Sequence, residues 1–224
     1  MPDCKAPAGL KIAIIVSGQS RGSNMTALID ACRTKRILGQ VSVVIGTRAD
    51  SPALERAREL GIPASVVSPK KYESDDSKYG DTLLRILRSY DAGLICLAGY
   101  MRILPQNVVD AYDGKIMNTH PALLPLFGGK GMYGEHVHKA VLESGMKVTG
   151  CTVHFVDHHY DNGPIILQTP VVVQEDDTAE TLASKVLQAE HQTYCEAVRL
   201  FAENRLEISG RKVKVLKQEK LDPE

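Results

Sequence analysis

The run KIAIIVS at residues 11–17, followed by GQSRGSN at residues 18–24, decides the fold. A continuous β-branched run predicts a strand buried on both faces, as in a parallel sheet. The loop rich in glycine and serine then leads into a helix pattern over residues 24–32. Free N–H groups at a helix N-terminus attract anions, most often phosphate. The loop is neither a Walker A nor a GxGxxG sequence, so a plain connector with Ser23 or Asn24 as helix cap is an equal alternative.

The same alternation continues along the chain. Apolar strand runs are predicted at residues 41–47, 64–68, 92–98 and 115–118, with helices at residues 52–60 and 79–90 between them. This order predicts an α/β, doubly wound, mostly parallel sheet with helices on both faces. Such sheets bind ligands beyond the carboxyl ends of their strands. We therefore expect segments 18–24, 99–104 and 118 onward to gather there.

The last third of the chain has a different pattern. Residues 147–156 and 164–173 predict a strand pair joined by the polar segment 157–163. Residues 178–204 predict one long helix, and residues 206–215 a C-terminal strand pair. We expect a single domain over residues 10–216, with a flexible N-terminus at 1–9 and a flexible tail at 217–224.

Composition excludes several classes of protein. Lys+Arg and Asp+Glu number 27 each, so the chain has no basic footprint for a nucleic acid. No apolar run approaches the roughly 18 residues of a membrane span, and no signal sequence is evident. The five cysteines are scattered, which favours reduced thiols in the cytoplasm. We expect Cys96 and Cys151 to be small core residues.

The segment NTHPALLP at residues 118–125 carries the candidate chemistry. Asn118 can donate a hydrogen bond to a carbonyl oxygen that becomes an oxyanion, and His120 can carry a proton near neutral pH. Asp161 could orient His120 or relay protons through water. A plain turn at residues 161–163 is a strong alternative. His154 is a second catalytic histidine or a structural one.

No metal is expected. The histidine pairs lack a metal-binding framework, because an H-x-H on a helix points its rings to different faces and no HExxH is present. The pairs considered are His136 with His138, and His158 with His159.

Four motifs in order resemble the phosphoribosylglycinamide formyltransferases, folate-dependent enzymes of purine biosynthesis. The resemblance covers residues 11–215. It is carried by SG and GSN at residues 17–18 and 22–24, LAGYMRIL at 97–104, NTHPALLP at 118–125, and VTGCTVHFV at 148–156 with DNGP at 161–164.

The resemblance implies transfer of a formyl group from 10-formyltetrahydrofolate, a cosubstrate, to the amine of glycinamide ribonucleotide (GAR). It implies small-molecule substrates and leaves a homodimer open. The implied catalytic residues are Asn118, His120, Asp161 and His154. The implied GAR-binding residues are Gly22, Ser23, Asn24 and Glu190. The implied folate-binding residues are Met101, Arg102, Ile103, Leu104, Asp157 and Tyr160.

Some features depart from the family pattern. The first loop has extra residues at 19–21, and the glycine-rich segment 127–132 is long enough to move over a site. The residue that steers the folate glutamate has no clear match, with Lys70, Lys71 and Lys78 as substitutes. The alternatives to GAR transfer are a 10-formyltetrahydrofolate hydrolase, a formyltransferase for another amine, and a non-catalytic nucleotide-binding module.

Overall fold

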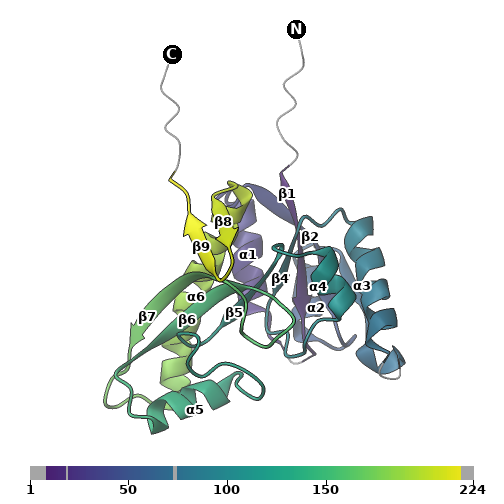
Figure 1. The fold of residues 1–224 in the computed structure, drawn as a ribbon. Helices are drawn as coiled ribbons and strands as arrows, with labels where there is room; N and C mark the ends of the chain where they lie inside the picture. Colours follow the sequence, from purple (N-terminus) through teal and green to yellow (C-terminus); the bar gives the residue numbers. More distant parts are fainter. Residues whose placement is uncertain (1–8, 19, 73–74, 218–224) are drawn as a thin grey trace, which may run out of the picture. The chain divides into compact units, whose positions relative to one another are not determined.

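A computed structural model describes residues 9–18, 20–72 and 75–217. The chain divides into two compact units, Met1–Met117 and Asn118–Glu224, and each is described by itself (Figure 1). The tails expected at 1–9 and 217–224 fall almost wholly outside the described residues, as does Gln19 in the first loop. The prediction of a single domain over residues 10–216 stays a prediction.

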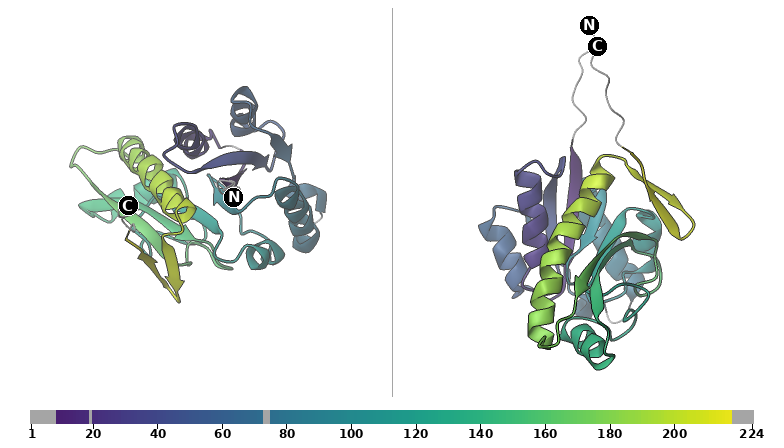
Figure 2. Two further views of the ribbon diagram at one scale, coloured as in Figure 1. Left: turned by 90° about the horizontal axis from the view of Figure 1, so that it is seen from above. Right: turned by 90° about the vertical axis from the view of Figure 1, so that its left-hand side faces the viewer.

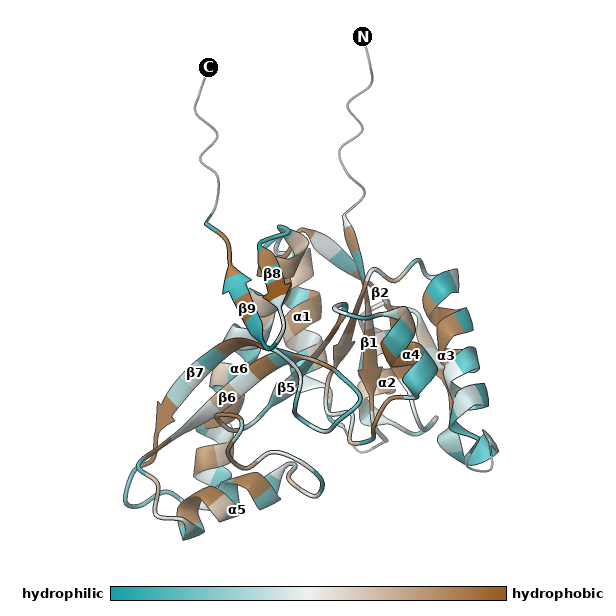
Figure 3. Ribbon diagram, viewed as in Figure 1, coloured by the Kyte–Doolittle hydropathy of each residue, from teal (hydrophilic) through white to brown (hydrophobic). Residues whose placement is uncertain are grey.

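Unit 1 holds four parallel strands in the order β3-β2-β1-β4. The side chains from Ile12 to Val16 are fully buried, which confirms the buried strand that their continuous apolar run predicts. In Figure 3, β1 is coloured mainly as hydrophobic, whereas α3 carries both kinds of residue. The strands are β1 (Leu10–Val16), β2 (Gly39–Gly46), β3 (Ala64–Val66) and β4 (Leu94–Leu97).

Helices cover both faces of the sheet in unit 1. Figure 2 shows α1 and α2 on one face and α3 and α4 on the other. In α1, Met25, Leu28 and Ile29 recur at helical spacing and are buried, as an amphipathic helix requires. The elements are α1 (Ser23–Arg33), α2 (Pro52–Glu59), the 3₁₀ helix η1 (Pro69–Tyr72), α3 (Asp76–Ser89) and α4 (Gln106–Ala111).

Unit 2 holds the strand order β5-β6-β7-β9-β8. The predicted pair β6–β7 is antiparallel, and so is the C-terminal pair β8–β9, whereas β7 pairs with β9 in parallel. The nine strands thus form a mixed, mostly parallel sheet, as predicted. The strands are β5 (Ile116–His120), which contains the boundary between the units, β6 (Val148–Phe155), β7 (Ile165–Val172), β8 (Leu206–Ser209) and β9 (Lys212–Val215).

The long helix α6 (Ala179–Ala202) is the main packing element of unit 2. It begins at the N-cap Thr178, whose side chain accepts from the Thr181 N–H while the Thr181 side chain accepts from the N-cap N–H, forming a capping box. Its apolar face lies against α5 (Glu135–Glu143), which sequence periodicity did not reveal. The buried cluster contains Val141, Cys151, Val173, Leu182 and Val186.

Cys96 and Cys151 are fully buried, which confirms both as core residues. Across the described residues, no helix is both long enough and apolar enough to span a membrane.

Candidate active site

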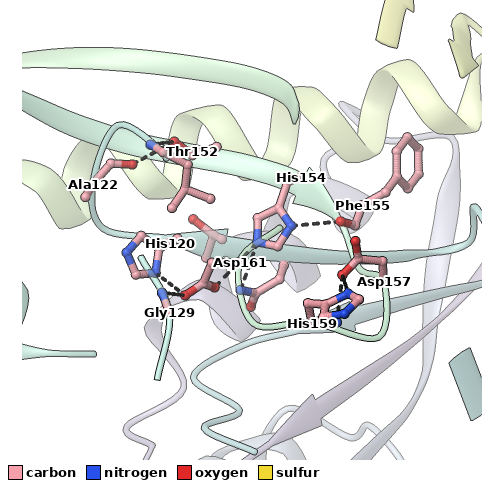
Figure 4. Close-up of polar contacts among 12 residues, drawn as sticks. His120, Ala122, Gly129, Thr152, His154, Phe155, Asp157, His159 and Asp161 are labelled. Atoms are coloured by element: carbon pink, nitrogen blue, oxygen red, sulfur yellow. Dashed lines mark hydrogen bonds and ion pairs between the residues drawn. The ribbon is translucent and has the colours of Figure 1, made fainter. Parts of the chain in front are cut away.

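Unit 2 brings together the four side chains predicted to be catalytic. Figure 4 labels three of them, His120, His154 and Asp161. Asn118 and His120 stand on β5, His154 near the end of β6, and Asp161 in the loop after β6. Asn118 Nδ2 lies 3.3 Å from His154 Nε2. His120 Nδ1 lies 3.5 Å from Asp161 Oδ2, and His154 Nε2 lies 3.8 Å from Asp161 Oδ1. We call these four residues the polar network.

The strand and the turn that follows it hold the first two members of the network. Side chains two positions apart on a strand share a face, so Asn118 and His120 point the same way. The turn beyond them is fixed by the buried Thr152 of β6. Its hydroxyl donates to the Ala122 carbonyl at 2.6 Å and accepts from the Leu124 N–H at 3.0 Å.

His154 is held as a neutral hydrogen-bond acceptor. Its Nδ1 lies 2.8 Å from the Phe155 carbonyl, which can only accept, so Nδ1 carries the hydrogen. Burial lowers the pKa of His154, and the ring is only 2% exposed. Nε2 therefore presents its lone pair to the Asn118 amide. One N–H of Asn118 is fixed in this way, and among the described residues the structure shows no acceptor for the second.

His120 has an acceptor at each ring nitrogen. Nε2 lies 2.7 Å from the Phe127 carbonyl, and Nδ1 faces the Asp161 carboxylate. An imidazolium can donate a hydrogen bond from each of its two ring nitrogens, so it fits a site with two acceptors. Asp161 Oδ2 also accepts from the Gly129 N–H at 2.9 Å. The glycine-rich segment thus supplies two backbone groups to the network, and sequence reasoning missed both.

The loop that carries Asp161 is tied down by Asp157. The Asp157 carboxylate accepts from the His159 N–H at 2.8 Å and from Asn162 Nδ2 at 2.7 Å. Gly163 closes the loop where only a glycine fits, since a Cβ would lie 1.9 Å from the Phe155 carbonyl oxygen. The turn expected at residues 161–163 is therefore present, and it holds Asp161 against His120.

Glu190 of α6 is a buried carboxylate next to the same strand. It is 8% exposed and accepts from Thr119 Oγ1 at 2.9 Å. Burial raises the pKa of Glu190 to about 7, while the hydrogen bond from Thr119 acts in the opposite direction. Sequence patterns gave no reason to single out Thr119.

In unit 1, the loops after β1 and β4 lie side by side. The Ser17 N–H donates to the Gly99 carbonyl at 3.3 Å, and the Met101 N–H donates to Ser17 Oγ at 2.9 Å. Ser20 Oγ donates to the Ala98 carbonyl at 3.3 Å. Two of the three segments expected to gather are therefore neighbours, and their relation to residues 118 onward stays a prediction.

The N-terminus of α1 has the features of an anion site. Its N-cap is Gly22, in the left-handed region at φ 77°, with no side-chain cap bond and no acidic residue in the first turn. The alternative in which Ser23 or Asn24 caps this helix is therefore wrong. Asn24 Oδ1 is buried and has no hydrogen-bond partner among the residues that the structure describes. The free N–H groups and the helix dipole favour a negative charge there.

The predicted folate residues fall in both units. In unit 1, Met101 and Ile103 are 50% and 45% exposed, and Leu104 is buried. Arg102 lies 3.9 Å from Asp76. In unit 2, Asp157 anchors its loop and Tyr160 is exposed.

The four histidines that form the H-x-H and H-H pairs lie in different environments. His136 packs edge-on against Tyr133 with ring centroids 5.3 Å apart, and His138 is buried. His158 and His159 are exposed. In the part of the chain that the structure describes, no three His, Cys, Asp or Glu side chains gather as a metal-ion site.

Comparisons with known proteins relate the whole chain to one family. The formyl transferase family model matches residues 10–198. The chloroplastic phosphoribosylglycinamide formyltransferase of Arabidopsis thaliana is 42% identical over 200 residues, which cover 89% of this chain and 68% of the relative. The phosphoribosylglycinamide formyltransferase of Escherichia coli K12 is 37% identical over 199 residues, covering 89% and 90%.

Among solved structures, glycinamide ribonucleotide transformylase 1 from Symbiobacterium toebii is 44% identical with a TM-score of 0.89. The match covers 97% of this chain and 99% of that one. The chain belongs to the formyl transferase family, and within it to the phosphoribosylglycinamide formyltransferases.

Proposed function

We propose how this chain performs the GAR transformylase reaction of de novo purine biosynthesis. The family implies a formyl-folate donor, which we take to be 10-formyltetrahydrofolate. The observation that carries the proposal is the polar network, in which a fixed amide N–H and a histidine–aspartate pair stand at one strand end. Such a group suits acyl transfer through an oxyanion.

The reaction is direct transfer. The GAR amine attacks the formyl carbon, a carbon–nitrogen bond forms, and the carbonyl oxygen becomes an oxyanion. The free N–H of Asn118 donates to that oxygen. The intermediate collapses as the bond to the folate nitrogen breaks. The proton lost by the amine is the one gained by the leaving folate nitrogen, so the transfer is balanced.

His120 and Asp161 supply charge and a path for the proton. An imidazolium at His120 stabilises the oxyanion, and the Asp161 carboxylate beside Nδ1 stabilises the imidazolium. Asp161 also lies near His154 Nε2, so water at Asp161 can carry the proton from the amine towards the folate nitrogen.

The substrate contacts rest on the family resemblance and on local geometry. The N-terminus of α1, with Gly22, Ser23 and Asn24, would hold the GAR phosphate. Glu190 would contact the glycinamide end. The exposed side chains of Met101 and Ile103 would lie against the folate ring system, together with the other predicted folate residues.

Formyl transfer measured with and without GAR tests the proposal. Folate deformylation that requires GAR, and that His120→Ala abolishes, supports the transferase mechanism. Formate release without an acceptor would indicate the hydrolase. Turnover with a different amine but not with GAR would indicate another formyltransferase, and binding of a nucleotide without turnover would indicate the non-catalytic module.

We place the enzyme in the cytoplasm, acting on small molecules and not on nucleic acid or membranes. The Arabidopsis thaliana relative is described as chloroplastic. Fractionation of the source cells would therefore test whether this protein lies in the cytoplasm. Sedimentation of the purified protein would test a homodimer.

A further inference from the structure

We propose that Thr119 is a positioning residue that keeps the Glu190 carboxylate ionised and oriented for the acceptor substrate. This inference rests on the proposed contact between Glu190 and GAR. Thr119 stands between two members of the polar network, Asn118 and His120, on β5. Its backbone is therefore fixed by the same strand that holds Asn118 and His120.

Strand geometry explains why Thr119 reaches Glu190. Neighbouring residues on a strand point to opposite faces, so the side chain of Thr119 leaves the face shared by Asn118 and His120. It meets α6, where its Oγ1 lies 2.9 Å from Glu190 Oε1. A threonine hydroxyl has one hydrogen to donate, and a carboxylate can only accept. The donor of this bond is therefore Thr119.

Burial makes this single bond decisive. Glu190 is 8% exposed, so its carboxylate has lost most of its water. Burial raises the pKa of Glu190 to about 7, and Thr119 opposes that rise. Neutral pH therefore falls within the titration range of Glu190, where one hydrogen bond to the charged form shifts the balance between the two forms.

A thiol on β6 senses the Glu190 charge. From β6, Cys151 is near enough that the Glu190 charge adds to burial in raising the pKa of the thiol. Cys151 donates to Thr193 Oγ1 at 3.4 Å, and that hydroxyl lies 2.6 Å from Thr169 Oγ1 of β7.

The cations nearest along α5 and α6 already have partners. On α5, Lys139 pairs with Glu135 at 2.7 Å, and on α6, Lys185 pairs with Asp177 at 2.7 Å. Among the described residues, the structure shows no ion pair to Glu190. Thr119 is therefore the group that favours its charged form.

Two substitutions separate the hydroxyl from the packing. Thr119→Val keeps the branched shape and removes the donor, whereas Thr119→Ser keeps the donor and removes a methyl group. The measurement is kcat/KM for GAR between pH 5.5 and pH 9, with KM for the folate as the internal reference. Titration of GAR itself is common to all variants and cancels in their ratio.

The valine variant should shift the acidic limb of the GAR profile to higher pH. A rise of one pKa unit from about 7 would lower the ionised fraction at pH 7 by a factor of about five. The loss should appear in KM for GAR, should vanish by pH 9, and should be absent in the serine variant. A purely structural threonine would instead lower Tm and depress activity equally at every pH, which would overturn the inference.

A second measurement separates this inference from the proposed role of Glu190. The titration of Glu190 can be followed by NMR in protein with ¹³C-labelled glutamate carboxyls, assigned with Glu190→Gln. An unchanged titration midpoint in Thr119→Val would overturn the inference about Thr119. A raised midpoint with an unchanged GAR profile would instead refute the contact between Glu190 and GAR, and the inference would fall with it.

Discussion

Asn118→Ala removes the donor that we place at the oxyanion and tests the mechanism directly. In preorganised sites, loss of one such donor lowers kcat by about 10²–10³, or about 2.7–4 kcal/mol in transition-state stabilisation. The loss should appear equally in kcat and kcat/KM, with KM for both substrates near the wild-type value, because the interaction forms only in the transition state.

The same substitution should cost much less in folding stability. Asn118 is half-buried, and its bond to His154 Nε2 is 3.3 Å long, at the weak end of the normal range. The main penalty is the His154 nitrogen left without a partner in a ring that is 2% exposed, about 1–3 kcal/mol. For a protein of this size, that corresponds to a Tm decrease of roughly 2–4 °C per kcal/mol, so the variant stays folded at 25 °C.

The assay follows folate deformylation by absorbance with both substrates saturating, alongside thermal unfolding. Asn118→Asp is the matched control, because it keeps the size and replaces the donor with an acceptor close to Asp161. We expect it to be at least as inactive as the alanine variant. A folded Asn118→Ala protein with kcat within about tenfold of wild type would refute the oxyanion role.

Three further outcomes follow from the contacts in unit 2. Asp161→Asn keeps an acceptor for the backbone but cannot balance an imidazolium, so kcat should fall sharply while circular dichroism stays unchanged; an unchanged kcat would reduce Asp161 to a turn residue. Burial raises the pKa of Glu190 from 4.5 to about 7, so the folded protein binds this proton more tightly than the unfolded chain. Ionisation of the carboxylate therefore lowers the free energy of unfolding as pH rises from 4.5 to 7. Glu190→Gln should be more stable than wild type by up to about 3 kcal/mol at pH 8, but not at pH 4. Denaturant unfolding that gave the same stability difference at both pH values would contradict this. Thr152→Val leaves the Ala122 carbonyl and the Leu124 N–H unpaired, so scanning calorimetry should show a loss of about 1–3 kcal/mol for each group, and an unchanged Tm would show that this turn does not need the hydroxyl.

The fold was predictable where burial imposes a sequence pattern. A strand covered on both faces must be apolar throughout, as residues 12–16 are, and a long amphipathic helix such as α6 repeats its apolar face over many turns. By contrast, α4 and η1 have six and four residues, too few for a period to emerge. The nine-residue α5 lies after a glycine-rich segment that reads as loop.

The sequence predicted the side chains of the candidate site but not the backbone groups that hold them. Asn118, His120, His154 and Asp161 are chemical types that a motif can display. The groups that hold them are the Phe127 carbonyl and the Gly129 N–H, and every residue has such groups. Phe127 even adopts φ 52°, a left-handed conformation that its residue type does not signal. The hydrogen bond between Thr119 and Glu190 joins residues 71 positions apart, so only the folded chain reveals it.

The contacts of His120 constrain how it can stabilise the oxyanion. Its ring is 3% exposed and both nitrogens already face acceptors, so a direct hydrogen bond to substrate would first require the Phe127 carbonyl to be released. The electrostatic attraction between a His120 imidazolium and the oxyanion does not require the Phe127 carbonyl to be released. It acts through space, and water screens it little because the ring is buried. Asn118, by contrast, has one N–H fixed by His154 and another left to donate. The division of labour that follows is a direct hydrogen bond from Asn118 and a positive charge from His120, with Asp161 and the glycine-rich segment holding that charge in place.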